Sequence, residues 1–182
     1  MADPDRDPQA TDRTGADRIY YEFAASAFVT LFWRQPLLEA AIGRFRDQDY
    51  AVVVVDASRW STTDDFHRDI AAALDFPAYY GENLDAFNDC MRDVVSRDYG
   101  FPEDAAGFVL VLSHYDRFAG ACPKPAQIVL DIVADRARNA AVYGTHVLCL
   151  VHSDDPDIVF DPVGATPVMW NRAEWLDSRR RG

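Results

Sequence analysis

Three short apolar segments constrain the fold of this chain more than any other feature. Ala51–Asp56 contains four consecutive valines, and residues 107–112 and 145–151 are similarly apolar. Continuous β-branched runs of this length are typical of strands covered on both faces, as in a parallel sheet. Residues 125–140 carry apolar side chains at helical spacing, so strand, helix and strand follow one another and indicate a parallel crossover. The fold class is therefore α/β, and we expect Ala51–Asp56 to be a central strand.

Further elements are expected on both sides of these strands. Residues 28–33 are typical of a short strand, and Pro36 suits the first turn of the amphipathic helix that follows. Ser61 or Thr62 is expected to cap another helix, on which His67 is expected to be an exposed surface residue. The apolar stripe of the first of these helices comprises Leu37, Leu38, Ala41, Ile42 and Phe45.

The chain is expected to consist of one tail and one domain. Residues 1–17 are polar and rich in Asp, Arg, Pro and Thr, which indicates a disordered tail. Residues 18–182 are expected to form a single domain. Within it, residues 18–50 are an N-terminal extension, 51–152 the core and 153–182 a C-terminal extension.

Two short segments of the C-terminal extension are candidates for edge strands. They are residues 158–160 and 167–170, which are apolar and lie between polar stretches. Cys90, Cys122 and Cys149 are odd in number and lack metal-like spacing, so we expect free thiols rather than a disulfide or metal site.

The most informative stretch for function is residues 76–91. Pro77 and Gly81 mark a loop that carries Tyr79 and Tyr80, and Asn83 is a plausible N-cap for the helix that begins there. One stripe of this helix is apolar and is formed by Leu84, Phe87, Met91, Val94 and Val95. The opposite side carries Asp85, Asp89 and Asp93 at i, i+4 spacing, which gives the helix an anionic face.

Two interpretations of the anionic face follow from the residues alone. It is either a solvated face of an acidic protein or a surface that binds a cationic partner. The formal net charge of -12 argues against nucleic acid as the main partner, because phosphate binding needs a basic surface. Aromatic side chains beside the acids favour a protein-binding surface, since tyrosines supply broad contact area.

The sequence of this stretch resembles that of the barstar family, the intracellular inhibitors of secreted ribonucleases. The matching residues are the run from Tyr79 to Ala86, of sequence YYGENLDA, followed by Asp89 and Cys90. The resemblance implies a three-layer α/β protein that inserts a helix and its preceding loop into a ribonuclease active site. The family's best-known member has a tryptophan beside the interface where this chain has Asn88.

The resemblance also implies which residues face the partner. Tyr79, Gly81, Asn83, Asp85 and Asp89 match the family's motif directly, and Asp135 takes the place of a glutamate that the family uses on a later helix. The full predicted partner-binding set comprises Tyr79, Tyr80, Gly81, Asn83, Asp85, Asn88, Asp89, Asp93 and Asp135. The expected partner is a secreted or toxin-type microbial ribonuclease, and the alternative is an immunity or interaction module that binds a different cationic toxin.

Catalytic patterns are missing from the sequence. It contains no phosphate-binding glycine loop, no nucleophile elbow, and no zinc-protease or Cys-x-x-Cys motif. His114, His146 and His152 are scattered on or after the predicted strands and are interpreted as structural residues. The paired aspartates could act as acid and base or hold a metal, but no companion cluster accompanies them. We therefore expect no enzyme, no cofactor and no metal site.

The sequence also predicts where the protein resides. No stretch is long and apolar enough to cross a membrane. The first residues, 1–8, are acidic and lack the apolar segment of a secretory signal. We expect a cytoplasmic protein.

Overall fold

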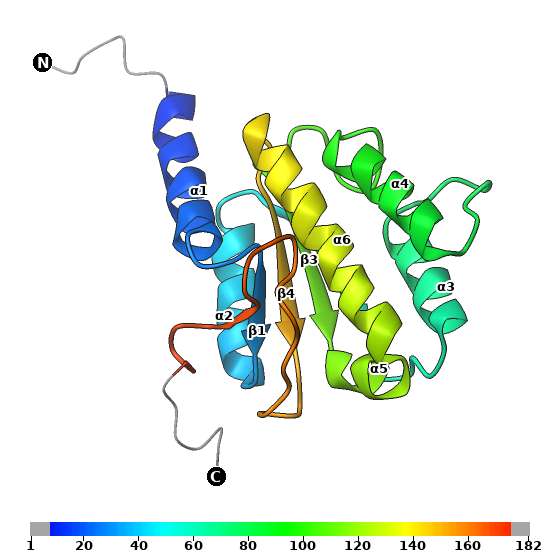
Figure 1. Cartoon of the computed structure of the whole chain (residues 1–182). Coiled ribbons are helices and arrows are strands. Elements are labelled where there is room, and N and C mark those ends of the chain that lie inside the picture. The colour runs from blue at the N-terminus through cyan, green and yellow to red at the C-terminus, as the bar shows by residue number, and fades with distance from the viewer. Residues whose placement is uncertain (1–7, 176–182) are drawn as a thin grey trace, which may run out of the picture.

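Five parallel strands form the middle layer of the protein, with helices on both faces (Figure 1). The computed structural model describes residues 8–175, with side chains from Thr14 onward. Neighbouring strands pair in the order β2-β3-β4-β1-β5, and every pairing is parallel. The predicted α/β class is thus confirmed. The strands are β1 (Val29–Phe32), β2 (Ala51–Asp56), β3 (Phe108–Ser113), β4 (Val147–His152) and β5 (Met169–Trp170).

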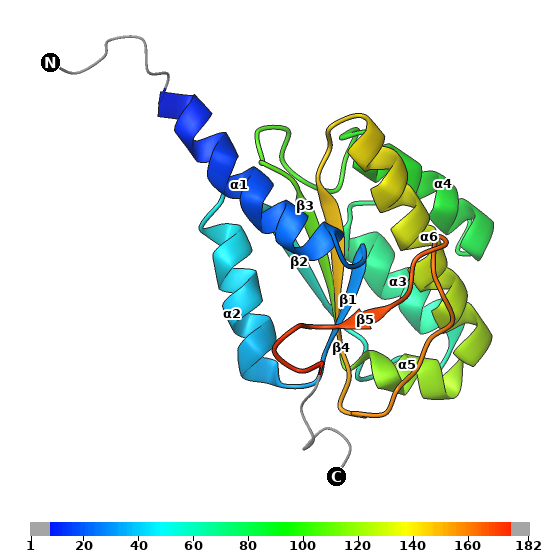
Figure 2. The same ribbon diagram turned by 60° about the vertical axis from the view of Figure 1, so that its left-hand side comes forward.

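The helices divide into two groups, one on each face of the sheet. Figures 1 and 2 show α1 (Pro8–Ala24) and α2 (Gln35–Arg46) on one face. The other face carries α3 (Thr63–Ala73), α4 (Leu84–Val95), α5 (Tyr115–Ala121) and α6 (Pro123–Val142). The prediction of residues 125–140 as helix is confirmed, but the short helix α5 before it was not expected.

Alternation along the inner strands explains the two layers of helices. In β3, Leu110 and Leu112 belong to the apolar cluster under α3–α6, whereas Val109 and Val111 belong to the cluster under α1 and α2. Successive side chains of a strand point to opposite faces, so an apolar run without polar interruption needs cover on both. All six residues of β3 and all six of β4 are buried accordingly.

The prediction that Ala51–Asp56 is a central strand is wrong. β2 lies at one end of the strand order and pairs with β3 alone, and Val54 is 46% exposed. The central positions go to β3 and β4, because β1 pairs with the far side of β4. The valine-rich run predicted cover on both faces, but only Val55 of this strand is buried, and the run carries no information on whether both edges are paired.

The predicted disorder of residues 1–17 is contradicted from Pro8 onward, where α1 begins. Residues 1–7 lie outside the described residues. Four buried side chains at helical spacing hold this helix against the sheet, namely Ala16, Ile19, Tyr20 and Phe23. The polar stretch is therefore the first part of a helix whose later turns pack, so its composition alone misled the prediction.

The segment after β4 returns to the sheet at its other end. The edge strand expected at residues 167–170 is present as β5, whereas residues 158–160 have no strand structure. Beyond β5, the carboxylate of Glu174 is fully buried and accepts hydrogen bonds from the backbone N–H groups of Trp33 (3.1 Å) and Arg34 (2.7 Å). The end of β1 is thus bound to the C-terminal segment.

The starts of two helices agree with the residues that predicted them. Pro36 lies in the first turn of α2, and Thr62 caps α3 through a capping box with Asp65. The three cysteines are free thiols. Among residues 8–175, the structure has no helix with the length and apolar character needed to span a membrane.

Candidate protein-binding surface

The loop before α4 is held by the side chain of Asn83. Its Oδ1 accepts a hydrogen bond from the backbone N–H of Ala86 (2.9 Å), and its Nδ2 donates to the carbonyl of Gly81 (3.0 Å). The predicted N-cap is confirmed, and the same amide fixes both the loop and the first helical turn. A Cβ on Gly81 would lie 3.2 Å from Asn83 Nδ2, so glycine permits this close approach.

The two tyrosines of the loop have different environments. Tyr79 is 80% exposed. Tyr80 is half-buried: its ring meets Phe76 edge-on at 4.9 Å between centroids, and its hydroxyl lies 2.5 Å from His67 Nδ1. The side chain of Tyr79 is therefore accessible to solvent, whereas Tyr80 fastens the loop to α3.

The exposure of His67 was predicted wrongly from the sequence. It was expected on the surface, but it is only 3% exposed and is covered by the ring of Tyr80. Burial lowers the pKa of His67 and raises the pKa of Tyr80, so both groups are neutral at pH 7. The apolar residues Phe66 and Ile70, which flank His67 on the inward side of α3, were the available signal that this side of the helix packs.

The α4 helix has one packed and one acidic face, as its sequence predicts. The packed face comprises Phe87, Cys90, Met91, Val94 and Val95, all buried, with Leu84 half-buried at its start. On the other face, Asp85 and Asp89 are exposed and Asp93 and Asn88 are half-buried. The acidic side chains therefore stand on a helix whose opposite side is fixed in the core.

Arg92 modifies the charge of this face. Its guanidinium forms ion pairs with Asp89 and Asp93, each at 3.3 Å, and all three side chains are partly or well exposed. The i, i+3 spacing of Asp89 and Arg92 was the signal for this contact. The ion pairs offset the repulsion between the aspartates, which leaves Asp85 as the carboxylate of the row without an ion pair among the described residues.

Asp135 lies on the neighbouring helix α6, which packs against α4 (Figure 1). Its carboxylate is paired with Arg136 and accepts a hydrogen bond from Asn139 Nδ2 at 3.1 Å. These contacts are all made within α6 and neutralise the carboxylate locally. A role for Asp135 in the partner-binding surface therefore stays a prediction.

Comparison with protein families identifies the chain. The family described as Barstar (barnase inhibitor) matches residues 50–152, which include the loop, α4 and the strands β2, β3 and β4. The chain belongs to the barstar family. The family's description is that of an inhibitor of barnase, so its members are inhibitors that bind ribonucleases.

The barstar match leaves part of the structure unassigned. It begins after α2 and ends with β4, so α1, β1, α2 and β5 lie outside it. None of the curated proteins matches the chain.

One solved structure shows a weaker likeness. A chain in the structure of Drosophila ORC bound to AT-rich DNA and Cdc6 is 18% identical, with a TM-score of 0.41. The match covers 80% of this chain and 50% of that one, so the protein spans about half of the other's length. A likeness of this degree carries no inference about function.

Proposed function

We propose that this barstar-family protein inhibits a microbial ribonuclease by inserting the loop before α4 and the acidic face of α4 into the enzyme's cationic active site. The observation that carries the proposal is the exposure of Tyr79 beside Asp85 and Asp89 on a loop and helix that are otherwise fixed. Exposed side chains on a fixed backbone are what a preformed binding surface requires.

The chemistry of a ribonuclease site suits these residues. Such a site holds the phosphates of RNA with cationic side chains, so carboxylates at matching positions can replace the phosphates through charge-assisted hydrogen bonds. Tyr79 adds a large aromatic surface with few rotatable bonds, which limits the entropy lost on binding. The acidic face thus supplies charge and the tyrosine supplies contact area.

The ion pairs of Arg92 do not oppose this role. An exposed ion pair contributes about 0.2–1 kcal/mol, whereas close charge pairs at a protein interface can couple with about 1.5–7 kcal/mol. Asp89 can therefore exchange Arg92 for a cation of the partner with a net gain. Arg92 would then turn toward solvent or toward Asp93.

The loop before α4 is fixed at two points, which explains why its two tyrosines have different proposed roles. The bond between Tyr80 and His67 joins the loop to α3, and the Asn83 cap joins it to α4. Both anchors exist before any partner is present, so little ordering is left for the binding step. Tyr80, Gly81 and Asn83 are accordingly proposed as positioning residues, and Tyr79, Asp85 and Asp89 as contact residues.

The N-terminal helices do not enlarge this surface in the proposed complex. α1 and α2 lie on the opposite face of the sheet from α4 (Figure 2). Their strand, β1, extends the sheet between β4 and β5. We therefore assign the N-terminal part to the stability of the fold.

The test is a titration of several barnase-like microbial ribonucleases with the full chain, with cleavage of an RNA substrate as the readout. Stoichiometric loss of activity with at least one enzyme is expected. Tyr79→Ala should weaken inhibition by at least about tenfold, because a central aromatic contact residue contributes about 1.4 kcal/mol or more. The matched control is Tyr143→Ala, which removes an 86% exposed tyrosine at the end of α6.

Two outcomes would contradict the proposal. Failure to inhibit any such ribonuclease would favour the alternative, an immunity or interaction module for a different cationic toxin. Equal weakening by Tyr79→Ala and Tyr143→Ala would show that the loop is not the contact surface. The same titrations, run without added ribonuclease, also show whether the protein itself cleaves RNA, which we do not expect.

A further inference from the structure

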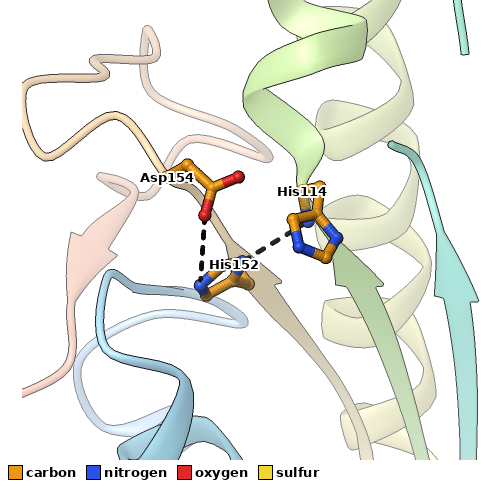
Figure 3. A group of neighbouring side chains, drawn as sticks. All are labelled: His114, His152 and Asp154. Carbon is orange, nitrogen blue, oxygen red and sulfur yellow. Dashed lines mark hydrogen bonds and ion pairs between the residues drawn. The ribbon is translucent and has the colours of Figure 1, made fainter. Parts of the chain in front are cut away.

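The carboxyl ends of three neighbouring strands bring polar residues together at one edge of the sheet. β2 ends at Asp56, β3 is followed by His114, and β4 ends at His152, with Asp154 two residues later. Figure 3 shows His152 between His114 and Asp154. Because the strands are parallel, residues far apart in sequence meet here, as ligand-binding residues commonly do in open α/β sheets.

Three of these residues are close enough to share one ion. One ring nitrogen from each of His114 and His152 and one carboxylate oxygen of Asp154 lie within 4.8 Å of one another. The rings of the two histidines meet edge-on, with centroids 5.2 Å apart. Among the described residues this is the only group of three or more His, Cys, Asp or Glu side chains with such spacing.

Each histidine has one ring nitrogen held by an acceptor outside the trio. Nδ1 of His114 lies 3.0 Å from Oδ1 of Asp56, and Nε2 of His152 lies 3.2 Å from the carbonyl oxygen of Trp33. A neutral imidazole that donates from one nitrogen keeps a lone pair on the other. In His152 this second nitrogen is Nδ1, which accepts a long hydrogen bond of 3.5 Å from the backbone N–H of His114, and an ion would take the place of that bond. Histidines that bind metals nearly always donate their second nitrogen to a carboxylate or a backbone carbonyl, which are the two acceptors present here.

The third member is also positioned by its surroundings. The backbone N–H of Asp154 donates to Oδ1 of Asp116 at 3.0 Å, which ties the loop after β4 to α5. Its carboxylate is 49% exposed and lies 4.0 Å from Nε2 of His152. His152 itself is 3% exposed, so the site has one buried member and two that reach it from the surface.

We propose that His114, His152 and Asp154 bind a divalent transition-metal ion of the zinc class, with a water molecule in the fourth position. Two imidazole nitrogens and one carboxylate oxygen are ligands that Zn²⁺ prefers, whereas Mg²⁺ and Ca²⁺ prefer oxygen alone. This proposal does not depend on the ribonuclease-inhibitor proposal, because the site lies at the ends of the strands and not on α4.

Binding needs only a small rearrangement of the ligands. Metal–ligand bonds of about 2.0–2.1 Å in a tetrahedron place the ligand atoms about 3.4 Å apart, and the three atoms now lie within 4.8 Å of one another. The side chains of His114 and Asp154 are 37% and 49% exposed, so they can close the difference by rotation while His152 stays in place. Asp56 is 62% exposed and can follow the His114 ring, which keeps their hydrogen bond. The ion would then link the ends of β3 and β4 to the loop that follows β4.

The experiment is a calorimetric titration of ZnCl2 into the untagged full chain after treatment with EDTA and its removal. We expect saturable binding of one ion per chain, with a rise in melting temperature on zinc addition because the ion binds the folded state. Asp154→Asn and His114→Asn should each weaken binding about tenfold or more. Asparagine suits position 114 because this residue is left-handed, with φ of 53°, a conformation that asparagine adopts readily.

The matched control is Asp157→Asn, an exposed carboxylate in the same loop, which should bind zinc as the parent does. Circular dichroism and thermal unfolding without zinc show whether each variant is folded, and Asp154→Asn serves if His114→Asn is not. Asp56→Asn, which changes only the acceptor behind His114, should weaken binding less than His114→Asn. Absence of saturable binding, equal affinity of the Asp154 variant and the parent, or equal binding of Mg²⁺ and Zn²⁺ would each overturn the proposal.

Discussion

Each face of the sheet contains a pair formed by a histidine and a tyrosine, and the surroundings of the two pairs differ. On the α4 side, His67 Nδ1 lies 2.5 Å from the Tyr80 hydroxyl. On the α1 side, His146 Nδ1 lies 2.8 Å from the hydroxyl of Tyr50, which also donates to the carbonyl of Ala16 on α1. Each pair fixes a segment to the sheet or to a helix that packs on it.

The neighbours of these pairs differ in exposure. Next to the first pair, Tyr79 is 80% exposed, and the described part of the chain leaves it uncovered. Next to the second, Tyr20 is 2% exposed, and its ring stacks on that of His146 with centroids 4.0 Å apart. The comparison shows that a tyrosine and histidine pair does not by itself mark a binding surface. On one face, the additional helix α1 covers the Tyr50–His146 pair and its neighbours. On the other face, no such helix covers Tyr79 among the described residues, so its side chain stays accessible.

The largest expected effect tests whether the α1 side is an integral part of the fold. Phe45 on α2 is fully buried, and it contacts the rings of Phe23 and Tyr50. Phe45→Ala should lower the free energy of unfolding by about 3–5 kcal/mol, because it removes a large core side chain and leaves a cavity. Denaturant unfolding measures this value. A loss below about 1 kcal/mol would mean that the N-terminal part folds as a separate appendage.

The next effect concerns binding on the α4 side. Asp89→Ala should weaken affinity for the target ribonuclease by about 2–5 kcal/mol, since partner cations would stay buried without their counter-charge. Stability should change by no more than about 0.5 kcal/mol, because Asp89 is exposed and its ion pair is a surface one.

The control for Asp89 is Glu39→Ala, which removes an exposed carboxylate from α2 on the opposite face. It should change neither affinity nor stability beyond about 0.5 kcal/mol. If the two variants lost equal affinity, only the overall charge would matter and the two faces would not differ in binding.

Acid pH should destabilise the protein through both histidine pairs. Burial lowers the pKa of His67 and of His146, so the unfolded chain takes up more protons than the folded one as pH falls through about 6.5. The free energy of unfolding should therefore be lower at pH 5.5 than at pH 7.5. Carboxylates contribute little in this window, because their usual pKa values lie near about 4.

Variants show how much each face contributes to this pH dependence. The groups that face His146 are Asp17, Tyr20, Tyr21, Tyr50 and Arg97, and those that face His67 are Asp64, Tyr80 and Glu82. His67→Gln and His146→Gln should each reduce the dependence, and the double variant should reduce it most. A double variant with the full parental dependence would contradict the assignment.

The smallest expected effect is on the rate of association. Arg92→Ala removes one positive charge from the acidic face, so the formal net charge of -12 becomes more negative by one. Stopped-flow association with the target should be faster than for the parent at low salt, and the difference should shrink as salt rises. Arg44→Ala makes the same change of charge on the opposite face, where Arg44 pairs with Glu22. Equal acceleration by both variants would point to net charge alone.

Local patterns in the sequence predicted much of this structure. The apolar runs identified β2, β3 and β4, and Asn83 and the two stripes of α4 identified the helix together with its packed and acidic faces. These features depend on residues within a few positions of one another, which is why single-sequence patterns contain them.

Features that depend on distant residues were the ones missed. The edge position of β2 depends on β1 pairing with β4, and the burial of His67 depends on where the loop places Tyr80. His114 and His152 seemed scattered because 37 residues separate them in the chain. One signal was available for them: both follow predicted strands, and the carboxyl ends of parallel strands meet at one edge.

The burial of Glu174 bears on where the chain can be cut. The family match ends at residue 152, yet a fragment that stopped there would lose β5 and the carboxylate that accepts from the N–H groups of Trp33 and Arg34. Those two donors would have to find water, and the outer edge of β1 would be left open to strands of other chains. We therefore expect the smallest soluble fragment to be longer than the segment that defines the family, and a fusion partner to be tolerated only beyond Glu174.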